Sequence, residues 1–212
     1  PLGCDDPSRG SPPMRLLPLL AALALAATPA AAETIVSAYT DLDTDRDCTV
    51  FERAEEGGDF ANIVCNGYKG YPVLIFYGDL RESLFYGYPP AGDLPPAWES
   101  FGAFNSTGPK IEWRIAKNGD DEIPFATIHR WFVSSVEDAE KQIEVLAISK
   151  VAQVSAREGC TVGLVVASGN AKANETARKV ADEHARDFSC GTDERVEIAG
   201  KVPLRVFYRQ ER

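Results

Sequence analysis

Four cysteines constrain the fold of this chain more than any other feature of its sequence. The chain has 212 residues and five cysteines, of which four follow residue 33: Cys48, Cys65, Cys160 and Cys190. In an exported chain, an even number of cysteines is typical of a disulfide framework. Four cysteines allow three pairings, so the residues around each cysteine must select among them.

Export is predicted by the sequence around Met14, the only methionine in the chain. Residues 14–32 open with a charged residue, Arg15, continue as an apolar run and end in three alanines. A charged start, an apolar stretch and a small-residue end are the parts of a secretory signal peptide. We therefore expect cleavage between Ala32 and Glu33, and a mature protein that is periplasmic or secreted.

The remaining residues of this region are predicted to lie outside the fold. We interpret residues 1–13, which contain the fifth cysteine, as an over-extended gene prediction or a cloning remnant. The apolar run of the signal is interrupted by Pro18 and Pro29 and is shorter than the ~20 residues that a membrane-spanning helix needs. No later segment comes closer, so we expect no membrane span.

The net charge of −10 narrows the classes of partner. An acidic protein is repelled at long range by nucleic acid and by anionic lipid. We therefore expect no nucleic-acid partner.

The first disulfide is predicted from a hairpin. Strand-like residues 48–51 and 60–65 flank a turn-rich segment, and the midpoint between Cys48 and Cys65 falls at the Glu56-Gly57 step. Residues equally far from the centre of a hairpin lie opposite each other, at a spacing that a disulfide can bridge. We predict the Cys48–Cys65 disulfide.

Further strands are predicted from the alternation of apolar and polar residues and from turn signals. They are residues 71–77 and 80–86, joined as a hairpin, and residues 111–115, 125–133, 143–151 and 161–167. Residues 97–104 are expected to form a short helical turn.

The strand at residues 111–115 is expected to bury one face, because Ile111, Trp113 and Ile115 alternate with polar residues. Asn118-Gly119 after it is typical of the turn of a β-hairpin. The partner strand is expected to start only at Phe125, because Pro124 has no N–H to give to a sheet.

An amphipathic helix is predicted at residues 171–188. Apolar positions recur along it as on a helix packed against a sheet: Ala177, Val180, Ala181, His184, Ala185 and Phe188. A strand of about eight residues from Cys160 and a returning helix of about 18 residues both span ~26 Å, which brings Cys190 beside Cys160. We predict the Cys160–Cys190 disulfide.

Together these elements predict an α+β fold, an antiparallel β meander of about seven or eight strands with one principal C-terminal amphipathic helix. We assign residues 33–190 to a single disulfide-stapled domain of sufficient length for a substantial core. Residues 191–212 are either an edge strand or a tail.

An acidic segment matches the ligand spacing of a calcium loop. Asp41, Asp43, Asp45 and Glu52 occupy positions 1, 3, 5 and 12 of an EF-hand loop. Position 6, where the loop needs glycine, is Arg46, and the flanks predict a hairpin strand instead of two helices. We expect no cofactor and a solvated acidic turn, with calcium binding as the alternative.

His129 is the candidate for a hydrolase site assembled from distant residues. It shares the strand phase of Phe125, Trp131 and Val133, where a histidine is more often a hydrogen-bonded core residue than a ligand. The sequence contains neither H-E-x-x-H nor G-x-S-x-G, and both predicted disulfides together leave no thiol nucleophile after residue 33. This favours a protein without catalytic activity.

Aromatic residues gather between Tyr39 and Trp98. Six of the seven tyrosines lie in this stretch. Such rings stack on sugars or grip peptides, since they give a large contact area at low entropy cost, and elsewhere they build the core of a sheet. We take Tyr88 and Trp98 as candidate partner-binding residues, with the proline-rich loop 87–96 as a second candidate surface.

Several short stretches of the sequence support a resemblance. They are Tyr39-Thr40-x-Leu42-Asp43, Gly70-Tyr71-Pro72-Val73, Gly78-Asp79-Leu80-Arg81, Glu112-Trp113-Arg114 and Pro124-Phe125-Ala126-Thr127-Ile128-x-Arg130-Trp131. On these stretches the chain resembles an uncharacterised family of small exported bacterial proteins, over residues 39–190. The resemblance implies export and a cysteine-stapled domain, and it brings no assigned activity.

The sequence therefore predicts an exported, non-enzymatic domain that binds a protein or another component of the cell envelope. One alternative is a domain stabilised by calcium at Asp41, Asp43, Asp45 and Glu52. The other is a hydrolase with a site around His129.

Overall fold

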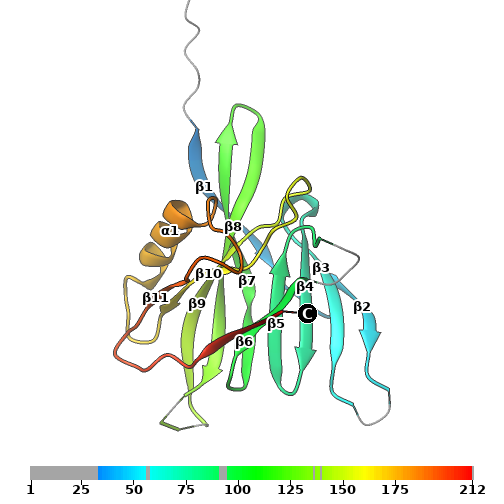
Figure 1. The fold of residues 1–212 in the computed structure, drawn as a ribbon, viewed down its shortest axis with the longest axis vertical. Coiled ribbons are helices and arrows are strands. Elements are labelled where there is room, and N and C mark those ends of the chain that lie inside the picture. Colours follow the sequence, from blue (N-terminus) through cyan, green and yellow to red (C-terminus); the bar gives the residue numbers. More distant parts are fainter. Residues whose placement is uncertain (1–32, 56–57, 91–94, 136, 139, 212) are drawn as a thin grey trace, which may run out of the picture. The chain divides into compact units, whose positions relative to one another are not determined.

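The chain forms three β-sheets and one α-helix within the residues that the computed structural model describes (Figure 1). These residues are 33–211 without 56–57, 91–94, 136 and 139. Contacts divide the chain into two units, Pro1–Ala30 and Ala31–Arg212, and all described residues belong to the second. The predicted signal peptide at residues 14–32 lies outside the described residues, as do residues 1–13.

The largest sheet has six strands in the order β1-β7-β8-β9-β10-β11. Its strands are β1 (Thr34–Asp41), β7 (Asn105–Asn118), β8 (Asp121–Ser134), β9 (Gln142–Lys150), β10 (Thr161–Val166) and β11 (Val196–Ile198). Neighbours run antiparallel except β10 and β11, which are parallel. A parallel pair requires a crossover, and α1 (Ala173–His184) lies in that connection.

The second sheet is an antiparallel meander of four consecutive strands. They are β2 (Cys48–Arg53), β3 (Ala61–Asn66), β4 (Pro72–Gly78) and β5 (Arg81–Tyr86), with the 3-10 turn η1 (Tyr68–Gly70) before β4. The two predicted hairpins form this sheet, β2 with β3 and β4 with β5.

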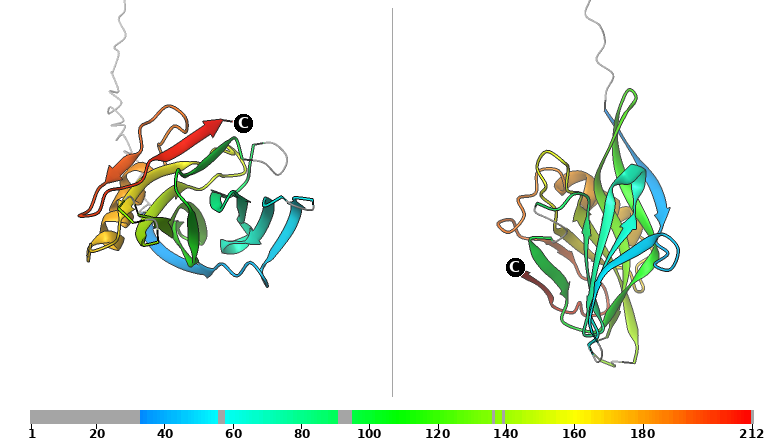
Figure 2. Two further views of the ribbon diagram at one scale, coloured as in Figure 1. Left: turned by 90° about the horizontal axis from the view of Figure 1, so that it is seen from below. Right: turned by 90° about the vertical axis from the view of Figure 1, so that its right-hand side faces the viewer.

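The third sheet is a two-stranded ribbon of β6 (Ala97–Phe101) and β12 (Phe207–Glu211). It lies on one side of the two larger sheets (Figure 2). The predicted helical turn at residues 97–104 is therefore wrong: the segment is extended because a partner strand from the end of the chain bonds to it. Residues 191–212 are not a tail, since they supply β11 and β12.

The fold class is α+β, as predicted, with mostly antiparallel sheets and one α-helix among the described residues. The single meander of about seven or eight strands is wrong, because twelve described strands divide among three sheets. The chain leaves the six-stranded sheet after β1, builds the four-stranded sheet and β6, and returns as β7. Local alternation predicts hairpins but does not encode such a long-range pairing.

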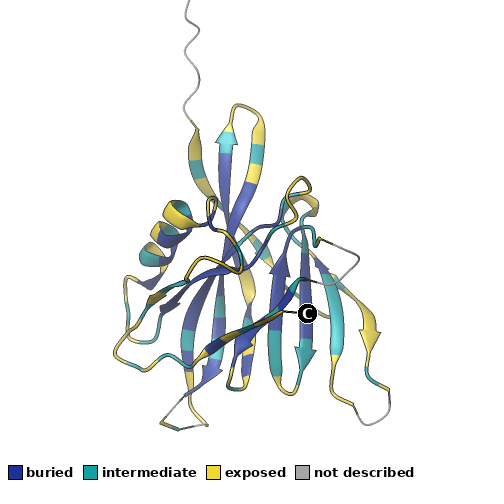
Figure 3. Ribbon diagram, viewed as in Figure 1, coloured by how far each residue is buried: buried dark blue, intermediate teal, exposed yellow. Residues whose placement is uncertain are grey.

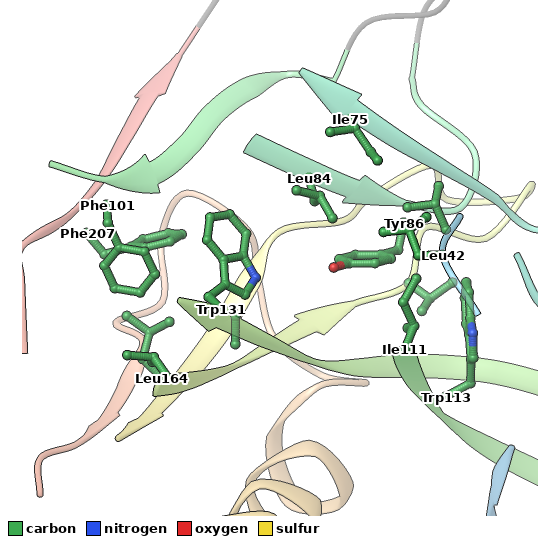
Figure 4. Packing of buried hydrophobic residues seen from close by; sticks show 14 of the residues in the cluster. Leu42, Ile75, Leu84, Tyr86, Phe101, Ile111, Trp113, Trp131, Leu164 and Phe207 are labelled. Atoms are coloured by element: carbon green, nitrogen blue, oxygen red, sulfur yellow. The ribbon is translucent and has the colours of Figure 1, made fainter. Parts of the chain in front are cut away.

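The apolar core has two main layers, one on each face of the six-stranded sheet, and a smaller third cluster includes Leu74 and Phe76. One layer lies against the four-stranded sheet and includes Ile75, Trp113 and Trp131 (Figure 4). The other lies under α1 and includes Ala177 and Val180. Figure 3 shows buried residues along the central strands and exposed ones on the outer side of the helix.

The helix differs from its prediction at both ends. It covers Ala173–His184, shorter than residues 171–188, and the flanking residues form turns. Within the predicted apolar stripe, His184 is exposed, so its assignment to the packed face is wrong. Ala185 and Phe188 beyond the helix are buried and extend the packed stripe.

Strand β7 buries both of its faces, and the predicted single buried face is wrong. Glu112 and Arg114 are each only 8% exposed. The reason is that α1 covers them with side chains of opposite charge, Arg178 and Asp182.

Strand β8 starts at Asp121, so Pro124 does not block pairing as predicted. Pro124 pairs with Ile115, and a register shift leaves the next residue, Phe125, as an extra residue in β8. Such a bulge changes the direction of the side chains on either side of it. Phe125 consequently packs in the layer under α1, whereas Trp131 faces the four-stranded sheet.

Two disulfides link the pairs that the sequence predicted. Cys48 and Cys65 are register partners on β2 and β3, with Cα atoms 4.0 Å apart. Cys160, just before β10, is bonded to Cys190, after α1, with Cα atoms 5.8 Å apart. None of the described helices is long and apolar enough to cross a membrane.

Candidate functional site

The predicted partner-binding residue Trp98 lines an open hollow of about 440 Å³. In the ribbon, Trp98 pairs with Gln210, and Ser100 pairs with Tyr208. Because residues two apart on a strand share a face, all four side chains point from one face of the ribbon, and all four line the hollow. Trp98 and Tyr208 are diagonal neighbours, within reach of each other for aromatic side chains. We call this site the aromatic hollow.

Both aromatic side chains of the hollow are supported from behind. Trp98 is half-buried and packs on apolar residues of the four-stranded sheet, among them Leu74 and Phe76. Tyr208 is 55% exposed, and its ring lies against the backbone of Gly102. A Cβ atom at Gly102 would be 2.5 Å from Cε2 of the tyrosine ring, so only glycine leaves room for the ring there.

The opposite face of the ribbon fixes it to the core. Phe101 packs edge-on against Phe207 and Trp131, with ring centroids 4.9 and 5.6 Å apart (Figure 4). The buried Glu99 carboxylate accepts a hydrogen bond from Arg209 Nη1 at 2.9 Å and from the Thr161 N–H at 2.6 Å. The ribbon therefore presents its outward aromatic residues on a fixed support.

The rim of the aromatic hollow is polar. It comes from Asp59 and from the turn between β4 and β5, where Arg81 Nη2 donates to Asp79 Oδ2 at 2.7 Å. Carboxylates accept hydrogen bonds, a guanidinium donates them, and the Gln210 amide does both. A concave aromatic surface with a few convergent polar groups is the usual composition of a small-molecule site.

The second predicted partner-binding residue, Tyr88, is not among the residues that line the hollow. Its ring packs against Tyr71 with centroids 5.3 Å apart, and its hydroxyl donates to the Gly70 carbonyl at 3.3 Å. These contacts give Tyr88 a local structural role. The proline-rich loop 87–96 includes residues 91–94, which lie outside the described residues.

His129 is fully buried in the core and is hydrogen-bonded through both ring nitrogens. Nε2 donates to the Gly108 carbonyl at 2.6 Å, since a carbonyl only accepts. Nδ1, 2.8 Å from the Tyr86 hydroxyl, therefore accepts from it. Burial lowers the pKa of His129 to about 4, although the hydrogen bond to the Gly108 carbonyl acts to raise it. These contacts are those of a neutral core histidine.

Three of the four carboxylates of the calcium-like segment, those of Asp41, Asp43 and Glu52, bond to other groups. Asp41 accepts from Lys110 Nζ at 2.5 Å, and Glu52 accepts from Asn62 Nδ2 at 2.6 Å. Asp43 pairs with Arg46 at 2.6 Å, and this ion pair lowers the pKa of the Asp43 carboxyl.

Glu52 lies on β2, away from the turn that holds Asp43 and Asp45. Among the described residues, no three His, Cys, Asp or Glu side chains converge as a metal site would require.

Comparisons of the chain with protein-family models, with curated proteins and with solved structures found no match. The resemblance to an uncharacterised exported family stays a prediction.

Tyr208 is the aromatic residue of the hollow that the sequence analysis missed. Its strand carries the alternation Phe207, Tyr208, Arg209, with Phe207 buried and Tyr208 exposed. That alternation was the available signal, but only the pairing with β6 gives Tyr208 its neighbour Trp98.

Proposed function

We propose that this protein is an exported domain that binds a neutral saccharide of the cell envelope through the aromatic hollow. The observation that carries the proposal is the placement of Trp98 and Tyr208, from distant parts of the chain, in one hollow with a polar rim.

The chemistry of the hollow suits a sugar. A sugar ring has a C–H face that packs on an aromatic ring and a perimeter of hydroxyls that both donate and accept hydrogen bonds. Trp98 and Tyr208 supply the rings, while Asp59, Asp79 and Gln210 supply acceptors and a donor. The net charge of −10 disfavours anionic polymers, which favours a neutral saccharide.

The proposed location rests on two features of the chain. Residues 14–32 have the sequence of a secretory signal peptide. The two disulfides are the kind of cross-link that forms and persists in oxidising compartments such as the periplasm or the extracellular space.

Tryptophan fluorescence tests the proposal, since the chain has three tryptophans. Trp113 and Trp131 are 0% and 3% exposed, so a change caused by a ligand in the hollow reports on Trp98. Titration with soluble, uncharged oligomers of N-acetylglucosamine should give a saturable change in emission. A proline-rich peptide, which also packs on aromatic grooves, serves as the competing class of ligand.

Substitutions then locate the site by calorimetric titration. Trp98→Ala and Tyr208→Ala should each weaken saccharide binding about tenfold or more, that is by about 1.4 kcal/mol. Gly102→Ala keeps both rings but displaces Tyr208, and should also weaken binding. Phe51→Ala, which removes an exposed aromatic ring from β2, is the matched control and should bind as the wild type does.

Two results would reject the proposal. One is the absence of saccharide binding by the folded wild-type protein. The other is undiminished binding by both the Trp98 and the Tyr208 variants.

A further inference from the structure

A second cavity, of about 420 Å³, lies between the four-stranded sheet and the start of β7. On one side it is lined by the core-facing residues of β3, β4 and β5. On the other side are Thr107, Gly108 and Pro109, where a register shift interrupts the pairing of β7 with β8. We call it the inter-sheet cavity. Its volume is within the range of small-molecule sites, about 300–1,000 Å³.

The base of the inter-sheet cavity is apolar, and polar groups surround it. Leu42, Ile63 and Ile75 line the base and belong to or pack on the core. The polar side chains are hydroxyls and one carboxyl group: Thr44, Tyr77, Thr107 and Glu82. The Thr107 hydroxyl bonds to the Glu82 carboxyl group, whereas the Thr44 and Tyr77 hydroxyls have no hydrogen-bond partner among the described residues.

The Glu82 carboxyl group has only neutral hydrogen-bond partners among the described residues. Its Oε2 accepts from the Thr107 N–H at 2.8 Å, and the Thr107 hydroxyl forms a second hydrogen bond with the carboxyl group. Burial raises the pKa of this carboxyl group, although the two hydrogen bonds with Thr107 act to lower it. The carboxylate has lost part of its hydration and has gained only two neutral donors, the N–H and the hydroxyl of Thr107, in return.

Two buried glutamates of the same fold, unlike Glu82, form ion pairs with arginine. Glu99 is 6% exposed and pairs with Arg209 at 2.9 Å, and Glu112 is 8% exposed and pairs with Arg178 at 2.6 Å. Glu82 forms no ion pair with any described residue. The inter-sheet cavity thus holds a carboxyl group that lacks the positive partner that these two glutamates have.

We propose that the inter-sheet cavity binds a small primary amine that carries an apolar group. The ammonium, with three N–H donors and no acceptor, matches the Glu82 carboxylate and the neighbouring hydroxyls, all of which can accept. The apolar group covers Leu42, Ile63 and Ile75. The negative field of the whole protein attracts such a cation and repels an anion.

Three probes of equal length and different charge test the inference: hexylammonium, hexan-1-ol and hexanoate. Ligand-detected NMR on the full domain at neutral pH measures each dissociation constant. Hexylammonium should bind at least about tenfold more tightly than hexan-1-ol, and hexanoate should bind most weakly. Equal binding of the amine and the alcohol would overturn the inference.

Substitutions assign the binding to the cavity. Glu82→Gln keeps the shape of the side chain and should remove the preference for the amine, leaving hexan-1-ol unchanged. If Glu82→Gln fails to fold, Tyr77→Phe removes one unbonded hydroxyl and should weaken hexylammonium severalfold. Trp98→Ala changes only the aromatic hollow and should bind hexylammonium as the wild type does. Amine binding that persists in folded Glu82→Gln, or in Tyr77→Phe if Glu82→Gln does not fold, would contradict the assignment.

Discussion

At the level of single residues, His129 shows how burial and two hydrogen bonds together fix a protonation state. The Gly108 carbonyl only accepts, so Nε2 carries the ring proton and donates to it. The Tyr86 hydroxyl donates a hydrogen bond to Nδ1, which carries no proton. A second ring proton would place a positive charge in a site without solvent, which burial disfavours. The fold therefore holds this side chain neutral, consistent with its pKa of about 4.

Stability should consequently fall as the pH is lowered from about 6.5 to about 4. In this window the unfolded chain binds a proton at His129, whose ordinary pKa is about 6.5, and the folded protein does not. Each pH unit then removes up to about 1.4 kcal/mol from the free energy of unfolding. Urea unfolding between pH 7.5 and pH 4.5 measures the slope.

In the His129→Gln variant the side chain at position 129 is neutral at every pH. Its free energy of unfolding should therefore lack this one-proton dependence on pH. His184→Gln, at an exposed position, should keep it. Parallel profiles for the wild type and His129→Gln would contradict the assignment of the proton to His129. A catalytic role would instead require His129 to contact solvent or a substrate, and it is 0% exposed.

At the level of elements, a network of charges attaches α1 to the six-stranded sheet. Arg114 donates two hydrogen bonds to Asp182, at 2.8 and 2.7 Å. Arg178 donates two to Glu112, at 2.6 and 3.2 Å. Ser37 on β1 donates to Glu112 at 2.5 Å and also contacts Arg114. Each buried charge therefore has an opposite charge from the other element.

Arg114→Met should destabilise the protein by about 3 kcal/mol, because it leaves Asp182 without its partner under the helix. Arg130→Met is the matched control. Its pair with Glu144 lies nearer the surface, with side chains 32% and 45% exposed, and should cost under about 1 kcal/mol. Chemical denaturation measures both differences. The double variant Arg114→Met/Asp182→Leu should recover most of the loss, and no recovery would argue against a charge effect.

Among the elements, hairpins were predictable and distant pairings were not. Residues 71–77 and 80–86 carry their own turn, and the structure forms β4 and β5 there. Residues 97–104 have no such local partner, and β6 forms because β12 bonds to it. In the sequence, the alternation of Glu112 and Arg114 with apolar residues is typical of a strand with one face in solvent. In the structure both residues are buried, because α1 covers them.

In the candidate site, too, local features were predictable from the sequence and long-range neighbours were not. Trp98 is recognisable from its residue type and from the tyrosines before it. Tyr208 becomes its neighbour through a long-range pairing, and Asp59 and Asp79 reach the rim through the ends of two hairpin turns. The Glu82 carboxyl group gives no sequence signal, because its special feature is the lack of an ion pair in the described fold.

For the whole molecule, the two disulfides and the last strand link segments that are far apart in the sequence. Cys48–Cys65 joins the outermost strand β2 to its sheet, and Cys160–Cys190 joins the start of β10 to the segment after α1. In the chain-entropy description, each is worth about 3 kcal/mol. Residues beyond Cys190 then add contacts that no disulfide enforces.

The last strand should be required for a stable fold. A chain that ends at Val206 loses Phe207, which is 5% exposed, and with it the packing on Phe101 and Trp131. It also leaves the buried Glu99 without Arg209. Loss of one large buried aromatic residue alone costs about 3–5 kcal/mol. Urea unfolding of the shortened and the full-length chains should show at least this difference.

A milder deletion separates the role of β12 from a general effect of shortening the chain. Removal of residues 211–212 takes away the exposed Glu211 at the end of β12 and should change the free energy of unfolding by less than about 0.5 kcal/mol. If the chain ending at Val206 is as stable as the full one, residues 33–206 form a self-sufficient domain and β12 is only appended to it. If it is destabilised as expected, the support of the aromatic hollow is part of the core. Saccharide binding and folding then depend on the same strand, and only substitutions on its outer face, such as Tyr208→Ala, can separate the two.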